Sequence, residues 1–165
     1  MKRFCSFFLF LAACIGMLAG CSSHSLEPVF FYYCRNADAY QYFQEDGVIA
    51  AEGRDLSGHT NDLRYLTALY LAGPLEEGLV CPFPRSTRLL DVSAANSSIQ
   101  IELSDFGNSM TDSEFSLAAA CLSKTYMEHF HTDNVTIKSG ARTITMNEKN
   151  LILFDAAIPE TTEGG

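Results

Sequence analysis

The first twenty residues limit what this chain can fold into. Lys2 and Arg3 give it a basic start, and residues 4–17 are predominantly apolar and carry no charge. Small residues then lead to Gly20 and Cys21. This order is typical of a secretory signal peptide, which is removed from the mature protein. We therefore expect residues 1–20 to be lost. The alternative is an uncleaved membrane anchor, although a run of about 17 residues is at the short limit for crossing a bilayer.

The segment Leu18-Ala19-Gly20-Cys21 resembles the bacterial lipobox. In that class of signals, the cysteine thiol receives a diacylglyceryl group and the peptidase cuts before it. The resemblance implies cleavage between Gly20 and Cys21, lipidation of Cys21, and anchoring to the cell membrane on its extracytoplasmic face. Two acyl chains, at about 0.8 kcal/mol per buried methylene, are sufficient for stable anchoring.

Charge excludes some classes of partner. The formal net charge is −9, and loss of Lys2 and Arg3 with the signal would make it −11. The sequence contains no basic cluster of the kind that neutralises phosphates, so we expect no nucleic-acid partner. The same charge repels anionic headgroups, which leaves the acyl chains on Cys21 as the expected membrane contact.

The rest of the chain is long enough for one domain. Removal of residues 1–20 leaves 145, which can bury a core without metal or disulfide support. We expect a polar tether over 21–27, a domain over 28–154 and a disordered tail over 155–165.

Three cysteines fall within this domain, so at most one intramolecular bridge can form among them. They are Cys34, Cys81 and Cys121. No two of them form a C-x-x-C pair. We interpret them as buried free thiols.

The pattern of apolar and turn-forming residues predicts the secondary structure of the first half of the domain. Val29–Cys34 reads as a central strand, because both of its faces are apolar. The extended segments Ala39–Gln44 and Val48–Leu56 flank Glu45-Asp46-Gly47, which predicts a hairpin. The segment 76–84 is expected to be a loop.

Leucines at three- and four-residue spacing predict a helix before that loop. Asn61 or Thr60 is the expected N-cap, and Gly73-Pro74 ends the helix. The expected apolar face consists of Leu63, Leu66, Leu69 and Tyr70.

The second half of the domain begins with two predicted strands, Leu89–Val92 and the cleanly alternating Ile99–Leu103. Later strands are expected at Val135–Ile137 and Thr143–Thr145, with another at Leu151–Phe154.

A helix is predicted between these pairs of strands. Thr111 and Glu114 have the spacing of a capping box, and Met110 and Phe115 that of a hydrophobic staple. The expected buried face consists of Phe115, Ala118, Leu122, Tyr126 and either His129 or Phe130.

Several segments, in order, resemble the GerMN domain of sporulation and spore germination proteins. Leu66–Pro74 resembles its helix-ending Leu-x-x-Gly-Pro. Gly78-Leu79 and Pro84–Val92 resemble its Gly-Leu…Pro-x-x-Thr-x-Leu-Leu-x-Val segment, and Ile99–Phe106 its Val-x-Leu-Ser-x-x-Phe strand. The match continues at Leu122–Thr125 and Val135–Ile137 and covers about Val29 to Thr145.

The resemblance implies an α/β fold of the α+β two-layer type, with two helices on one face of a small mixed sheet, similar to ring-building modules. Family members are commonly lipoproteins of Gram-positive bacteria, placed near sporulation or cell-wall remodelling, and they have no established catalytic constellation. This chain departs from the family in carrying one copy, where the sporulation protein that names it carries two. It also has Asn96-Ser97 where relatives often place Asn-Gly.

Candidate chemical groups favour neither a metal nor a catalytic site. His129 and His131 point to different faces of a helix, so they cannot bind one ion with Cys121 unless the helix has ended. The carboxylates at Glu45-Asp46, Glu76-Glu77 and Asp105 fall in loops. Ser57 and Ser104 lack the Gly-x-Ser-x-Gly context of an activated serine. We expect no enzyme activity, cofactor or metal.

The resulting functional expectation is a lipid-anchored, non-catalytic envelope domain for protein–protein interaction or assembly, in sporulation, germination or cell-wall remodelling. Its partner is expected to be an envelope protein or a second copy of the chain. Tyr40, Tyr42 and Phe43 are the expected interaction residues, because aromatics on a hairpin are hard to bury together. The alternative is a module that binds wall glycan or peptide, or a peptidoglycan hydrolase.

Overall fold

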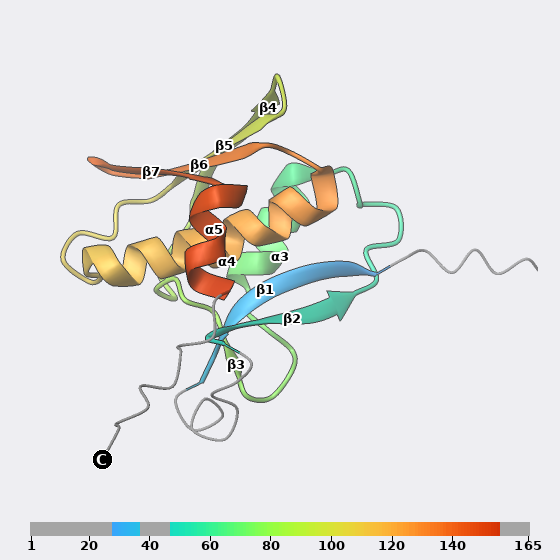
Figure 1. Cartoon of the computed structure of the whole chain (residues 1–165), viewed down its shortest axis with the longest axis horizontal. Helices are drawn as coiled ribbons and strands as arrows, with labels where there is room; N and C mark the ends of the chain where they lie inside the picture. Colours follow the sequence, from blue (N-terminus) through green and yellow to red (C-terminus); the bar gives the residue numbers. More distant parts are fainter. Residues whose placement is uncertain (1–27, 37–46, 156–165) are drawn as a thin grey trace, which may run out of the picture.

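A computed structural model describes residues 28–36 and 47–155 of the chain. Figure 1 labels its helices and strands. In chain order they are β1 (Val29–Arg35), β2 (Ile49–Arg54), α3 (Leu63–Leu71), β3 (Leu79–Val80), β4 (Leu89–Ala95), β5 (Ser98–Leu103), α4 (Asp112–Phe130), β6 (Asn134–Ser139), β7 (Arg142–Asn147) and α5 (Glu148–Asp155). Among these described residues, no helix is both long and apolar enough to span a bilayer.

The strands form two sheets, and α4 lies between them (Figure 1). One sheet is antiparallel, in the order β2-β1-β3, and the other is mixed, in the order β4-β5-β6-β7 with β5 parallel to β6. Helix α4 packs on β1 and also contacts β6 and β7. The expected α+β class is confirmed, but the strands are divided between two sheets, and within the described residues a further helix, α5, follows β7.

Strand β1 is central, as expected, and it inserts Val29, Phe31 and Tyr33 into the core. β3 pairs only with the end of β1, at Cys34 and Arg35. At Tyr32, before that point, the helices satisfy the backbone of β1. The backbone N–H of residue 32 donates to Thr125 Oγ1 at 2.9 Å, and the Tyr70 hydroxyl donates to the carbonyl of the same residue at 2.9 Å. The edge of β1 is therefore covered by the helices at Tyr32 and by β3 at Cys34 and Arg35.

The predicted strand pair around Asn96-Ser97 is confirmed. Both turn residues have positive φ, 48° and 58°, as in the type I′ turn that is favoured between right-twisted strands. The clean alternation in β5 places Ile99, Ile101 and Leu103 in the core. The strands predicted at Val135–Ile137 and Thr143–Thr145 are confirmed as β6 and β7.

The predicted capping box opens α4. The backbone N–H of Glu114 donates to Thr111 Oγ1 at 3.2 Å, and the Glu114 carboxylate accepts from the Thr111 backbone N–H at 2.7 Å. Met110 and Phe115 are buried on either side of the cap. The expected face is also confirmed, since Phe115, Ala118, Leu122 and Tyr126 are buried.

Three details differ from the sequence prediction. Asp62, not Asn61 or Thr60, caps α3, because its carboxylate accepts the Tyr65 backbone N–H at 3.0 Å. The segment predicted as a loop contains β3. Leu151–Phe154 belongs to a helix rather than a strand, and the Asn147 side chain accepts the Asn150 backbone N–H at 3.1 Å in its first turn.

The predicted hairpin is described only in part. Strand β2 falls within the expected segment Val48–Leu56, and its partner is β1, paired from Val29↔Arg54 to Cys34↔Ile49. Several predicted segments lie outside the described residues. They are the signal peptide over 1–20, the tether over 21–27, the segment Ala39–Gln44 with Glu45-Asp46, and the tail from residue 156.

Candidate functional site

A surface groove of about 900 Å³ lies between the last turn of α3, β3 and the loop that leads into β4. We call it the α3–β3 groove. Its lining is partly aliphatic and aromatic, and it includes Leu71, Leu79, Val80, Phe83 and Leu89. Gly73, with φ of +96°, ends α3 at the groove wall, and Pro74 then turns the chain away.

Apolar side chains are also exposed in and beside the groove. Val80 lines it and is 43% exposed, while Leu75 follows Pro74 and is 83% exposed. Leu90, next to the lining residue Leu89, is 54% exposed because a bulge interrupts the β4–β5 pairing at this point. Of these three exposed apolar residues, Val80 lies in the groove itself, while Leu75 and Leu90 are chain neighbours of lining residues.

The polar part of the lining is basic. Arg85 and Arg88 are both exposed, and the Arg88 guanidinium donates to the carbonyls of Arg85 and Thr87 at 3.4 and 3.2 Å. The Thr87 hydroxyl is buried and has no hydrogen-bond partner within the part of the chain described. A buried hydroxyl without a partner is energetically unfavourable.

A buried ion pair on β2 holds the groove wall in place. Arg54 donates to the Gly73 carbonyl at 2.7 Å and contacts the Glu52 carboxylate. The other Glu52 oxygen accepts the backbone N–H groups of Leu75 and Glu76, each at 2.8 Å. The Arg54 side chain therefore holds the end of α3, and the Glu52 side chain holds the segment that follows it.

The environment of this pair favours its charged form. The Arg54 guanidinium lies 4.9 Å from the Phe31 ring centre and 5.7 Å from that of Tyr33. Burial would raise the pKa of Glu52, but the hydrogen bonds from Glu76, Arg54 and Leu75 outweigh burial and hold this pKa below its ordinary value.

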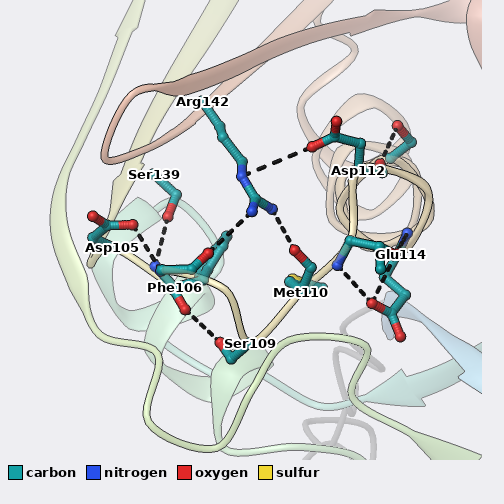
Figure 2. A network of polar contacts seen from close by, with 11 residues as sticks. Asp105, Phe106, Ser109, Met110, Asp112, Glu114, Ser139 and Arg142 are labelled. Carbon is teal, nitrogen blue, oxygen red and sulfur yellow. Dashed lines mark hydrogen bonds and ion pairs between the residues drawn. The ribbon is translucent and has the colours of Figure 1, made fainter.

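A second polar network surrounds the start of α4 (Figure 2). Arg142 donates to the carbonyls of Met110 at 2.7 Å and Gly107 at 3.0 Å, and its Nε lies 3.9 Å from the Asp112 carboxylate. Asp105, a carboxylate considered from the sequence, accepts the Gly107 backbone N–H at 2.9 Å in the same loop. Its observed role is to shape this turn.

The other candidates from the sequence do not assemble into one site. A ring nitrogen of His129 lies 2.6 Å from the Thr60 carbonyl, His131 ends α4 exposed with φ of 50°, and Cys121 is buried. Among the described residues, no three His, Cys, Asp or Glu side chains gather as metal ligands would.

The remaining candidates with described positions are also apart from one another. Glu76 and Glu77 are exposed, the Ser57 hydroxyl donates to Asp55, and the Ser104 hydroxyl accepts the Arg88 backbone N–H at 2.9 Å. Gly20, Cys21, Tyr40, Tyr42 and Phe43 lie outside the described residues.

Neither protein-family models nor curated proteins match this chain. One solved structure that matches is that of the tandem GerMN domains of the sporulation protein GerM from Bacillus subtilis, at 16% identity and a TM-score of 0.48. The match covers 75% of this chain and 43% of that chain. At this level of similarity, membership of the family stays a prediction from the motifs.

Proposed function

We propose that this chain is a lipid-anchored, non-catalytic envelope domain that binds an acidic, partly apolar segment of a partner protein in the α3–β3 groove. The observation that carries the proposal is the combination of exposed Val80 with exposed Arg85 and Arg88 in the lining of one groove. The buried centres of protein interfaces are more apolar than the rest of the surface, and arginine is enriched in interfaces.

Charge supports the choice of an acidic segment. The chain as a whole has a net charge of −9, so a pair of arginines in one groove is a local exception to its surface. Opposite charge on the partner orients the encounter, and burial of Val80 and its neighbours supplies the binding free energy.

The proposed cellular location and biological process rest on the sequence. The order Lys2-Arg3, apolar run and Cys21 supports export and lipidation, and the GerMN resemblance supports a role in sporulation, germination or cell-wall remodelling. Tyr40, Tyr42 and Phe43 stay candidates for partner contacts on sequence grounds alone. A wall-binding module or peptidoglycan hydrolase is the competing function, and incubation with purified peptidoglycan distinguishes the hydrolase.

We expect a photo-crosslinking amino acid at Val80 to capture an envelope protein in membranes of the producing bacterium, while the same amino acid at exposed Thr143 on β7 does not. Changing both Arg85 and Arg88 to glutamate should lower the yield about tenfold, since surface ion pairs are worth up to about 1 kcal/mol each and 1.4 kcal/mol is tenfold. Lys138→Glu together with Lys149→Glu, at exposed positions on β6 and α5, is the matched control, because it also reverses two positive charges.

Equal crosslinking from Val80 and Thr143 would contradict the groove proposal. Release of soluble fragments from purified peptidoglycan by the full-length protein, abolished by Glu76→Gln, Glu77→Gln or Asp105→Asn, would favour the hydrolase instead.

The anchor has its own test. We expect Cys21→Ser to leave the chain unprocessed or to release it from the membrane, because only a thiol can accept the diacylglyceryl group. Membrane fractionation with metabolic labelling by a radioactive fatty acid measures both outcomes. A variant that is still trimmed at Gly20 and still membrane-bound would show that the lipobox interpretation is wrong.

A further inference from the structure

Two cysteine side chains meet where β1 packs on α4. Cys34 Sγ and Cys121 Sγ lie 3.6 Å apart, although 87 positions separate them in the sequence. Cys34 is 6% exposed and Cys121 is fully buried. The contact is therefore enclosed in the core, and it joins the central strand of one sheet to the helix shared by both sheets.

The third cysteine of the domain differs from this pair. Cys81 is only partly buried and lines the α3–β3 groove. Burial raises the pKa of Cys81 despite a hydrogen bond from the Phe83 backbone, so this thiol stays protonated near neutral pH. Cys34 has the opposite tendency, because the hydrogen bond from the Cys121 thiol lowers the pKa of Cys34 against the effect of burial.

We propose that Cys34 and Cys121 form a disulfide while the chain folds in an oxidising environment, and that Cys81 remains a free thiol. The oxidant is a second disulfide, either of a small thiol such as glutathione or of a thiol oxidoreductase. The Cys34 thiolate attacks it and releases one thiol, and the Cys121 thiolate then attacks the mixed disulfide and releases the other. Two cysteine thiols are thus oxidised and one external disulfide is reduced to two thiols.

Burial determines when this exchange occurs. An external oxidant reaches neither sulfur once β1 and α4 have packed, so the mixed disulfide must form before the core closes. The same burial then protects the finished bond from reductants. The bond closes a loop of nearly ninety residues, which restricts the unfolded chain strongly.

The test uses the full-length chain with Cys5, Cys14 and Cys21 changed to alanine, so that only the three cysteines of the domain remain. This background carries no lipid, and the outcome is therefore independent of the proposed anchor and function. The reduced, denatured protein is refolded in detergent with reduced and oxidised glutathione, alkylated under denaturing conditions and digested. Mass spectrometry should find a Cys34–Cys121 peptide pair two hydrogens lighter than the separate peptides, with Cys81 alkylated.

Thermal unfolding gives a second readout. Oxidation should raise the melting temperature by about 10 °C. The rise should persist in Cys81→Ala and be absent from Cys34→Ala and Cys121→Ala. Complete alkylation of all three thiols after refolding, or a bridge from Cys81 to either partner, would overturn the proposal. The alkylation result on the three-cysteine chain decides the matter even where a core variant fails to fold.

Discussion

Replacing Leu122 by alanine is expected to lower the free energy of unfolding by about 2–5 kcal/mol, the range for leucines deleted from a packed core. Leu122 is fully buried on α4, which contacts both sheets, so neither sheet can move alone to fill the cavity. Urea denaturation at neutral pH, followed by circular dichroism, measures the change.

The matched control is Glu77→Ala. Glu77 is exposed in the segment between α3 and β3, and a surface substitution of this kind is expected to change stability by no more than about 0.5 kcal/mol. Equal losses in the two variants would mean that the buried face of α4 is assigned wrongly.

Replacing Glu52 by alanine should destabilise the domain by about 3–5 kcal/mol, because it leaves the buried Arg54 guanidinium without its counter-charge. It also removes the acceptor for the backbone N–H groups of Leu75 and Glu76. Urea is the appropriate denaturant, since guanidinium salt screens charge. Changing Glu52 and Arg54 together to leucine and methionine should restore the part of the loss that comes from the unpaired charge, because an apolar pair leaves no buried charge.

The same pair gives a pH dependence. The folded-state pKa of Glu52 lies below its unfolded value, so its stabilisation is complete above the unfolded pKa, about 4.3, and is lost as the pH falls through the folded value. The difference in stability between the wild type and Glu52→Gln should therefore shrink on acidification below about pH 4.3. A Glu52→Ala variant as stable as Glu77→Ala, or a difference independent of pH, would contradict this role for the pair.

Local signals explain what could be predicted from the sequence. Thr111 and Glu114 make the cap of α4 with residues three positions apart, and Asn96-Ser97 form a turn between adjacent strands. Such contacts need no knowledge of the rest of the chain. The failures have local causes too. Several polar residues compete to cap α3, and the apolar run from Leu151 is too short for its periodicity to separate helix from strand.

The division into two sheets and the candidate site could not be predicted, since both depend on distant contacts. No pattern in Leu79-Val80 indicates that it pairs with the end of β1. Glu52 and Arg54 occupy alternate positions of one strand and so share a face, which is a signal for an ion pair. Only the packing of α3 shows that this face is buried and that the pair supports a groove wall.

The position of β1 at the start of the domain has a consequence for the nascent chain. This apolar, aromatic strand is synthesised before α3 and long before α4, the helices that cover it. Until residue 130 has emerged from the ribosome or a translocation pore, the segment Val29–Tyr33 has no stable apolar surface to pack on. Uncharged aromatic strands in that state are prone to pair with other chains. Chaperone binding to a nascent chain of this protein is therefore expected to concentrate on its first strand.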